Sequence, residues 1–293
     1  MVKRFLVSDE DLEELIHSYC RDFTQLAGEG RYDPITGRDS EVQQTILILL
    51  QKGRKNCCYL APAGVGKTAL VVGLAQQIVQ NNVPEYLKGA RVLEVDLASM
   101  AAGTGSMSEF QERFIPICKG LAERYHDPKY PKFIMFLDEI HTIMPTVAGS
   151  AYRGLSEVMK PYLTVGDLHV IGATTRDEYR MFVAEDPALD RRFQKIFLNI
   201  PSPEETMEIL KNIRPGYEKH HRITIPDECL ELIINLTNEH MRRRNQPDKS
   251  IIMMDASSAY HVLENGIGGT LTKDDVKYMV GKETSLNPKA LEG

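Results

Sequence analysis

Short apolar runs alternate with amphipathic segments through the middle of the chain. Each run has the length of one strand and is bounded by polar or turn residues. The runs predict strands at residues 57–60, 91–96, 133–137, 169–173 and 195–198. Strands that alternate with helices favour a parallel sheet with helices on both faces. The pattern therefore predicts an α/β fold for this part of the chain.

The pattern changes at both ends. Ser8 precedes an acidic amphipathic segment, which predicts a capped helix from residue 9 to about residue 23, before a linker at 28–30. After Pro201-Ser202-Pro203, apolar positions recur at helical spacing without an intervening strand pattern. Helices are expected at 41–51, 204–214, 227–239, 249–263 and 273–280. We expect a helical segment and linker at 1–31, a large α/β domain at 32–200, and a small helical domain at 201–293.

One loop carries the clearest chemical signal. The apolar run at 57–60 leads into a loop of small residues that ends in Gly66-Lys67-Thr68 and begins a helix. In phosphate-binding loops of this form, backbone N–H groups surround the phosphates, the lysine reaches the β- and γ-phosphates, and the hydroxyl binds Mg²⁺. The helix N-terminus adds partial positive charge. The predicted ATP-binding residues are Pro62, Ala63, Gly64, Val65, Gly66, Lys67, Thr68 and Ala69.

The loop departs from the usual pattern at its first position. The pattern begins with glycine, and this chain has Ala61 there. Alanine is small enough for the loop to form, but it would be strained if the backbone required a positive φ. The alternative is a chance Gly-Lys-Thr before a helix.

Two adjacent carboxylates follow a run typical of a buried strand. Asp138 and Glu139 come directly after residues 133–137, and the carboxyl ends of strands are where an open α/β sheet binds ligands. We expect Asp138 to bind the Mg²⁺ of the nucleotide and Glu139 to orient and deprotonate the attacking water. The alternative is a strand that ends in solvated acidic residues.

Composition restricts the classes of function. The 42% share of hydrophobic residues supports a substantial core, and the net charge of −6 makes nucleic acid a less favoured partner. The five cysteines show no zinc spacing and suit a reducing cytosol. We expect a cytoplasmic protein, because neither a signal peptide nor an apolar run long enough to span a membrane is recognisable.

These motifs occur in an order that resembles the AAA+ ATPases, and specifically the first ATPase module of the Clp-type unfoldases and disaggregases. The resemblance extends from about Tyr32 to the C-terminus. It rests on DPITGR at 33–38, the Lys67 loop, VPEYLKG at 83–89, DEIH at 138–141, GATTRDEYR at 172–180, DRRFQK at 190–195 and PDK at 247–249. It implies an ATP hydrolase with a helical lid domain.

The resemblance also assigns roles to residues outside the two motifs. Thr175 matches the position that senses the γ-phosphate, although a threonine at a strand end can also simply satisfy a loop. Arg191 and Arg192 match arginine fingers that reach the nucleotide of a neighbouring subunit, although an arginine pair is otherwise typical of a solvated face. The segment that closes over the adenine is matched by Ile35, Gly37 and Arg38. His141 is expected to be structural.

A finger supplied in trans implies a closed ring, and the resemblance implies a homo-hexamer. The segment that matches the central-pore loop has Ser106 where an aromatic residue is usual and Gly105 where a basic residue is usual. Tyr152 is expected either to grip polypeptide in the pore or to pack at the start of the next helix.

The sequence therefore predicts a ring-forming ATPase that uses ATP and Mg²⁺ to remodel or disassemble protein substrates. One alternative is a nucleotide-gated scaffold without threading, which the absent pore aromatic favours. Another is a nucleic-acid remodeller or loader, for which Arg242-Arg243-Arg244 is the tight basic cluster. A second ATPase module or partner protein is a further expectation, because residues 271–276 resemble the connector into such a module.

Overall fold

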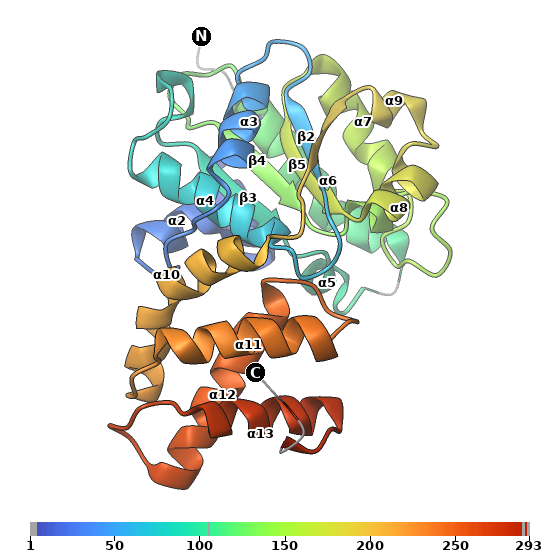
Figure 1. Ribbon diagram of the computed structural model, residues 1–293. Helices are drawn as coiled ribbons and strands as arrows, with labels where there is room; N and C mark the ends of the chain where they lie inside the picture. Colours follow the sequence, from blue (N-terminus) through green and yellow to red (C-terminus); the bar gives the residue numbers. More distant parts are fainter. Residues whose placement is uncertain (1–4, 105, 289–290, 292–293) are drawn as a thin grey trace. The chain divides into compact units, whose positions relative to one another are not determined.

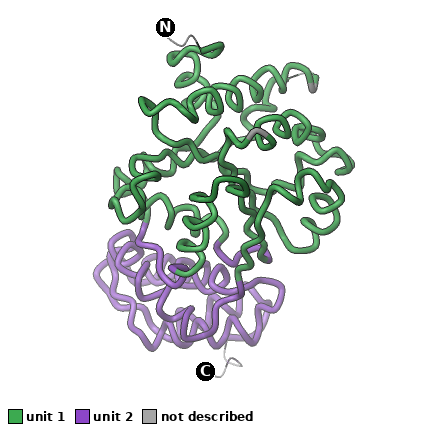
Figure 2. The backbone as a smooth tube through the Cα atoms, turned by 90° about the horizontal axis from the view of Figure 1, so that it is seen from above, with its two compact units in different colours: residues 1–32, 40–61, 67–198 green, residues 33–39, 62–66, 199–293 purple. Residues whose placement is uncertain are grey.

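The computed structural model describes residues 5–104, 106–288 and 291 of the 293-residue chain. The chain forms two compact units (Figure 2). Unit 1 consists of residues 1–32, 40–61 and 67–198, and unit 2 consists of residues 33–39, 62–66 and 199–293. No helix in the described part of the chain has the length and apolar character needed to span a bilayer.

A six-stranded sheet forms the centre of unit 1, with strand order β1-β3-β4-β5-β2-β6 (Figure 1). Neighbouring strands pair in parallel except β1 and β3, which are antiparallel. Every residue of β2, β4 and β5 is buried, which explains why these strands are continuous apolar runs in the sequence. The strands are β1 (Cys20–Asp22), β2 (Asn56–Leu60), β3 (Arg91–Val95), β4 (Phe133–Leu137), β5 (His169–Thr174) and β6 (Phe193–Phe197).

Helices cover both faces of this sheet because successive strand residues point to opposite faces. Cys58 and Leu60 of β2 belong to one core cluster with helices α1 (Asp9–Tyr19), α5 (Leu97–Ala101), α6 (Met107–Arg124) and α7 (Leu155–Val165). On the other face, the Tyr59 hydroxyl lies 3.0 Å from that of Thr45 in α3 (Asp39–Leu49). Phe23 of α2 (Phe23–Gly28) contacts Phe136 of β4 there, and α2 packs against α4 (Lys67–Val79).

Short helical turns complete unit 1. Two of them begin shortly after the strands β4 and β5, where the chain turns toward the next element. They are η1 (Glu85–Leu87), η2 (Ile140–Ile143), α8 (Arg176–Glu178), η3 (Tyr179–Val183) and α9 (Pro187–Asp190).

The N-terminal segment differs from the sequence prediction. Ser8 caps α1 as expected, since its hydroxyl accepts a hydrogen bond from the backbone N–H of Asp11. The predicted helix to residue 23 is wrong beyond Tyr19, because residues 20–22 form β1 on the edge of the sheet, with Arg21 opposite Glu94. Asp22 then caps α2 by accepting from the N–H of Gln25. The segment we expected at 1–31 is thus part of the compact unit that contains the sheet.

Four helices make up most of unit 2, and their apolar faces form a core of their own. Ser202 and Glu205 form a capping box at the start of the first helix, which Pro203 begins. An isolated bridge between Thr224 and Thr270 is the β pairing found among the described residues of 199–293. The helices are α10 (Pro203–His221), α11 (Asp227–His240), α12 (Asp248–Asn265) and α13 (Lys273–Thr284). The predicted α/β fold with a C-terminal helical part is confirmed.

Gly172 of β5 allows η2 to pack closely against the sheet. A Cβ at this position would lie 2.6 Å from Cδ1 and 3.1 Å from Cγ2 of Ile140. We expect Gly172→Ala to lower the free energy of unfolding by about 1–3 kcal/mol through overpacking. A Cβ at Gly53 meets no atom within 4 Å, so Gly53→Ala should change it by less than about 0.5 kcal/mol. Urea unfolding of both variants checks this, and equal midpoints would contradict it.

Candidate functional site

The predicted phosphate-binding loop, residues 61–66, connects β2 to α4. Gly64 and Gly66 have φ values of 78° and 97°, a backbone region that side chains rarely allow, so both positions require glycine. Ala61 is not among the described non-glycine residues with positive φ, and its N–H donates to the carbonyl of Thr174 at 3.2 Å. The strain considered for alanine at the first loop position therefore does not arise.

Within unit 2, three contacts hold the loop. The buried Arg38 guanidinium donates to the carbonyl of Val65 at 3.0 Å, and also to the carbonyl of Asn199. The Asn245 side chain donates to the carbonyl of Ala63 at 3.0 Å, and the backbone N–H of Asp248 lies 3.4 Å from the carbonyl of Gly64. The loop is thus fixed by segments that are distant in sequence.

Two of the residues that the resemblance assigns to the adenine lie beside Arg38. Gly37 has a φ of 73°, and a Cβ there would be 3.9 Å from Cγ1 of Ile209 in α10. Ile35 belongs to the same short segment of unit 2 and is partly buried. The predicted adenine segment and loop residues 62–66 thus fall in the same compact unit.

Lys67 begins α4 with its side chain largely buried, and its Nζ donates to the carbonyl of Ala61 at 3.4 Å. Thr68 and Ala69 follow in the first turn of the helix, where backbone N–H groups lack partners within the helix. The Lys67 charge is near enough to Glu139 to oppose the rise in the pKa of that carboxyl group.

Glu139 has an uncommon backbone conformation. Its φ of 48° and ψ of 46° place it in the left-handed region, which is rare for a residue other than glycine and is often found at functional sites. The backbone N–H of Glu139 donates to the Asp138 carboxylate at 2.9 Å. Partial burial raises the pKa of Glu139, the Asp138 charge raises it further, and Lys67 counteracts both effects. A carboxylate with a raised pKa is a better proton acceptor near neutral pH.

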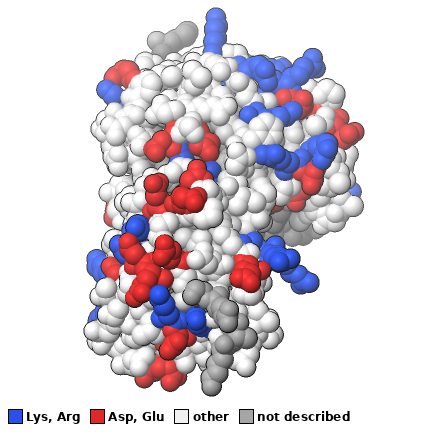
Figure 3. Space-filling model, viewed as in Figure 1, with Lys and Arg blue, Asp and Glu red and all other residues white. Residues whose placement is uncertain are grey.

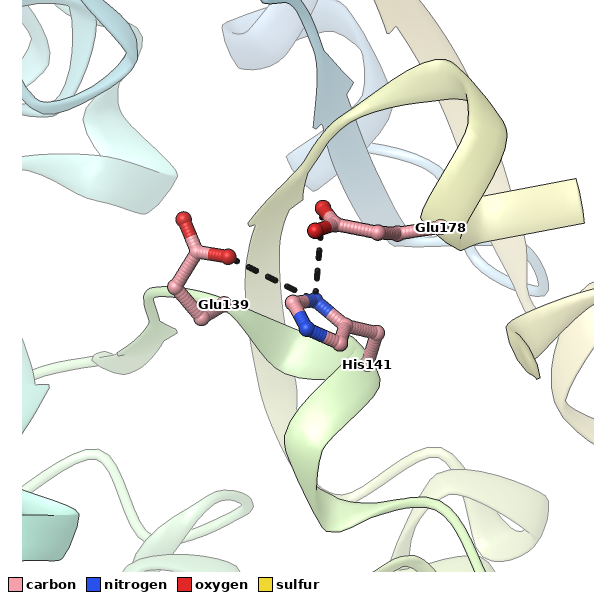
Figure 4. Close-up of side chains that lie close together, drawn as sticks. All are labelled: Glu139, His141 and Glu178. Carbon is pink, nitrogen blue, oxygen red and sulfur yellow. Dashed lines mark ion pairs between the residues drawn. The ribbon is translucent and has the colours of Figure 1, made fainter. Parts of the chain in front are cut away.

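A hydrogen-bonded cluster at the end of β5 lies next to these carboxylates. The Glu178 carboxylate accepts from the hydroxyls of Thr174 and Thr175, at 2.9 and 2.8 Å, and from the backbone N–H of Thr175. His141 Nδ1 lies 2.9 Å from the Thr174 hydroxyl and 3.5 Å from an oxygen of both Glu139 and Glu178. Figure 4 shows the two carboxylates directed toward the imidazole ring.

Ligand atoms of Glu139, His141 and Glu178 lie within 4.8 Å of one another, a spacing that could hold a metal ion. The hydrogen bonds argue against that use. The Thr174 hydroxyl gives its one proton to Glu178, so its oxygen can only accept from His141. Nδ1 therefore carries a proton and has no lone pair for a metal.

A pocket of about 490 Å³ opens beside Asp138 and Glu139. Its other walls come from the end of α1, β1, the end of β3, the start of α5, Thr142 of η2, and Tyr152. The Tyr152 ring is partly buried against Phe110 of α6, with ring centroids 5.7 Å apart. This contact favours the packing alternative for Tyr152 over a role in gripping polypeptide.

The predicted finger residues follow α9. Arg191 is exposed, and its Nε donates to the backbone carbonyl of Pro187 at 3.0 Å. Arg192 reaches the carbonyl and hydroxyl of Thr164, each at 3.5 Å. Neither guanidinium forms an ion pair with a carboxylate in the described part of the chain.

Ser106, the expected pore-loop position, is the N-cap of α6 and accepts from the N–H of Glu109 at 3.3 Å. Gly105, the other departure noted in this loop, lies outside the described residues. The Arg242-Arg243-Arg244 cluster follows α11 and lines a pocket of unit 2 together with Glu283, so its charge is partly offset there.

Sequence reasoning identified the acidic pair but missed Thr174 and Glu178. It treated Thr175 as the polar group of this strand end and His141 as structural. One signal was available, because Thr175 and Glu178 have the Thr-x-x-Glu spacing of a capping box, and both of its hydrogen bonds are present. The capping box identifies the helix start, but it does not by itself indicate contact with His141.

Two protein-family models match this chain. A model described as "ATPase family associated with various cellular activities (AAA)" matches residues 57–200, and one described as "AAA lid domain" matches residues 202–278. The chain belongs to the AAA ATPase family. The resemblance stated from the motifs is confirmed.

Individual relatives are Clp-type proteins. Chaperone protein ClpB of Vibrio cholerae is 38% identical over 250 residues, which are 85% of this chain and 29% of ClpB. The ATP-dependent Clp protease ATP-binding subunit ClpL of Staphylococcus aureus is 40% identical over 243 residues, or 82% of this chain and 34% of ClpL. An Hsp104–casein complex from S. cerevisiae superposes with a TM-score of 0.82 at 33% identity, covering 95% of this chain and 47% of Hsp104. The AAA chain thus spans about a third of the two Clp relatives.

We expect Lys67→Ala to weaken ATP binding by at least about 10-fold, because a charge-assisted hydrogen bond contributes about 1.5–3 kcal/mol. Titration with a fluorescent ATP analogue measures the Kd. Lys52→Ala, which removes an exposed lysine, is the control and should leave the Kd unchanged. Similar Kd values for the two variants would contradict the assignment of the loop.

Proposed function

We propose that this chain binds ATP with Mg²⁺ and hydrolyses it to remodel proteins. The alternative is a scaffold whose assembly is controlled by the bound nucleotide and which threads no polypeptide. The observation that carries the proposal is the Asp138-Glu139 pair after β4, with Glu139 in a left-handed conformation and under the influence of the Lys67 charge. Glu139 accepts a proton from the attacking water, and Lys67 with loop residues 62–66 binds the phosphates. Ile35, Gly37 and Arg38 surround the adenine, and Thr175 senses the γ-phosphate.

Thr68 and Asp138 would hold the Mg²⁺. A hydroxyl and a carboxylate are the oxygen donors that this ion prefers, so the residues present fit it. When bound with ATP, Mg²⁺ neutralises charge on the phosphates. Binding of Mg²⁺ by these two residues needs no nitrogen or sulfur ligand. The nearby cysteines Cys57 and Cys58 are buried in β2.

We also propose a cytoplasmic ring, and the exposed Arg191 is the feature that supports the ring. Arg191 is exposed and has no carboxylate partner among the described residues, so it is available to a nucleotide bound by a neighbouring subunit. We propose a homo-hexamer in which Arg191 and Arg192 act in trans on the neighbour's ATP. We propose a large nucleotide-binding domain at 32–200, with the N-terminal segment 1–31 packed in the same compact unit as the sheet, and a lid domain at 201–293.

The proposed substrate is a protein or a protein assembly. One solved relative is a complex of Hsp104 with casein, which is the basis for this choice. The scaffold alternative is favoured by Ser106, since a helix-capping serine offers no aromatic surface for a polypeptide. Nucleic acid is less favoured, because the net charge is −6 and both signs of charge occur across the face drawn in Figure 3.

Glu139→Gln tests the hydrolytic role. The glutamine keeps the size of the side chain but cannot accept a proton, so ATP should bind while turnover falls by about 10²–10⁴-fold. Steady-state phosphate release and nucleotide affinity are the two measurements. Turnover at the wild-type rate would show that the base lies elsewhere.

Subunit mixing tests the finger. Arg191→Ala alone should bind ATP and lose hydrolysis, whereas Arg180→Ala, at a residue 79% exposed, should not. In a random equal mixture with Lys67→Ala, about a quarter of the interfaces join an intact loop to an intact finger, so some ATPase activity should return. No recovery, under conditions where labelled subunits demonstrably exchange, would exclude a finger in trans.

A further inference from the structure

The Glu139 carboxylate needs an orienting partner if it is to act as a base. Its side chain is half-exposed and has several rotatable bonds, so its position is not fixed by packing. Among the described residues, His141 brings a side-chain nitrogen close to this carboxylate, with Nδ1 3.5 Å from a carboxylate oxygen. The imidazole is therefore the group in a position to restrict where the carboxylate lies.

His141 itself is firmly held. Its side chain is only 12% exposed, and its ring stacks on Phe182 with the centroids 5.9 Å apart. Its Nδ1–H donates to the Thr174 hydroxyl at 2.9 Å, and the Thr174 side chain is fully buried in β5. The ring thus connects the start of η2 to the neighbouring strand.

Glu178, on the other side of His141 from Glu139, is also held in place. Partial burial alone would raise the pKa of Glu178, but hydrogen bonds from Thr175 and Thr174 and the nearby His141 lower it below its usual value. Glu178 is therefore a carboxylate at neutral pH and only accepts hydrogen bonds. Its three bonds to the two threonines leave it little freedom.

We propose that His141 is a positioning residue for ATP hydrolysis: the Nδ1–H bond to Thr174 fixes the ring, and the ring then presents its positively polarised Nδ1–H edge 3.5 Å from the Glu139 carboxylate and directs that carboxylate toward the attacking water. The inference rests on the proposed function of Glu139. It differs from a purely structural role for His141 because it assigns the effect to one ring nitrogen. It also links the base to the end of β5, directly before the predicted sensor, Thr175.

The test compares two substitutions that reproduce different nitrogens of the ring. The amide N–H of His141→Asn takes the place of Nδ1–H, whereas that of His141→Gln takes the place of Nε2. We expect His141→Asn to retain kcat within about 3-fold, and His141→Gln to lose about 10-fold, part of the 10²–10⁴-fold contributed by a general base. KM and the Kd for ATP should stay within about 2-fold of wild type in both. Equal kcat values for the two variants, or a loss found only in KM, would overturn the proposal.

A second pair keeps the test decisive if a His141 variant fails to fold. Thr174→Ser retains the hydroxyl and should keep kcat, while Thr174→Val removes it and should lower kcat as His141→Gln does. Equal kcat in this pair would also overturn the proposal. Glu139→Gln is assayed alongside: if that variant hydrolyses ATP normally, the proposed function fails, whereas a slow Glu139→Gln with equal His141 variants contradicts the positioning role alone.

Discussion

The parallel pairing of β4 with β5 is the interaction on which the candidate site depends. The register sets Leu137 opposite Gly172, so the two residues after β4 emerge beside Thr174, which ends β5, and Thr175, which follows it. Gly172 has no side chain, and this lets Ile140 pack against the strand and bring His141 within hydrogen-bonding distance of Thr174. A shift of one residue would turn alternate side chains to the other face and separate these groups.

The sequence predicted the strands of this sheet well because a parallel sheet covered on both faces needs continuous apolar runs. All five predicted strands occur within two residues of their expected bounds. The strand at residues 20–22 was missed, because Cys20-Arg21-Asp22 has neither length nor apolar alternation and pairs only at an edge. Its pairing with β3 is a tertiary contact, and no local pattern could have distinguished it from the last turn of α1.

The candidate site also has a part that the sequence predicts and a part that it does not. The glycines, Lys67 and the acidic pair were predictable because phosphate binding and water activation require those residue types at fixed spacing. The surroundings of His141 were not, because its partners come from Thr174 and Glu178, more than thirty residues away along the chain. A histidine next to an acidic pair is compatible with many contacts, and the register of β4 and β5 places this one beside Thr174.

The backbone of Glu139 shows how the site accommodates strain. A left-handed conformation costs about 1–3 kcal/mol for a residue that is not glycine, so neighbouring contacts must offset it. The N–H of Glu139 donates to Asp138, and its carbonyl accepts from the N–H of Thr142 at 2.8 Å, which begins η2. Glu139 therefore turns the chain from the end of β4 into η2, and Asp138 and Glu139 need not alternate as successive residues of a strand would. Under the proposed function, this turn lets the two adjacent carboxylates take different tasks, Asp138 toward the metal and Glu139 toward water.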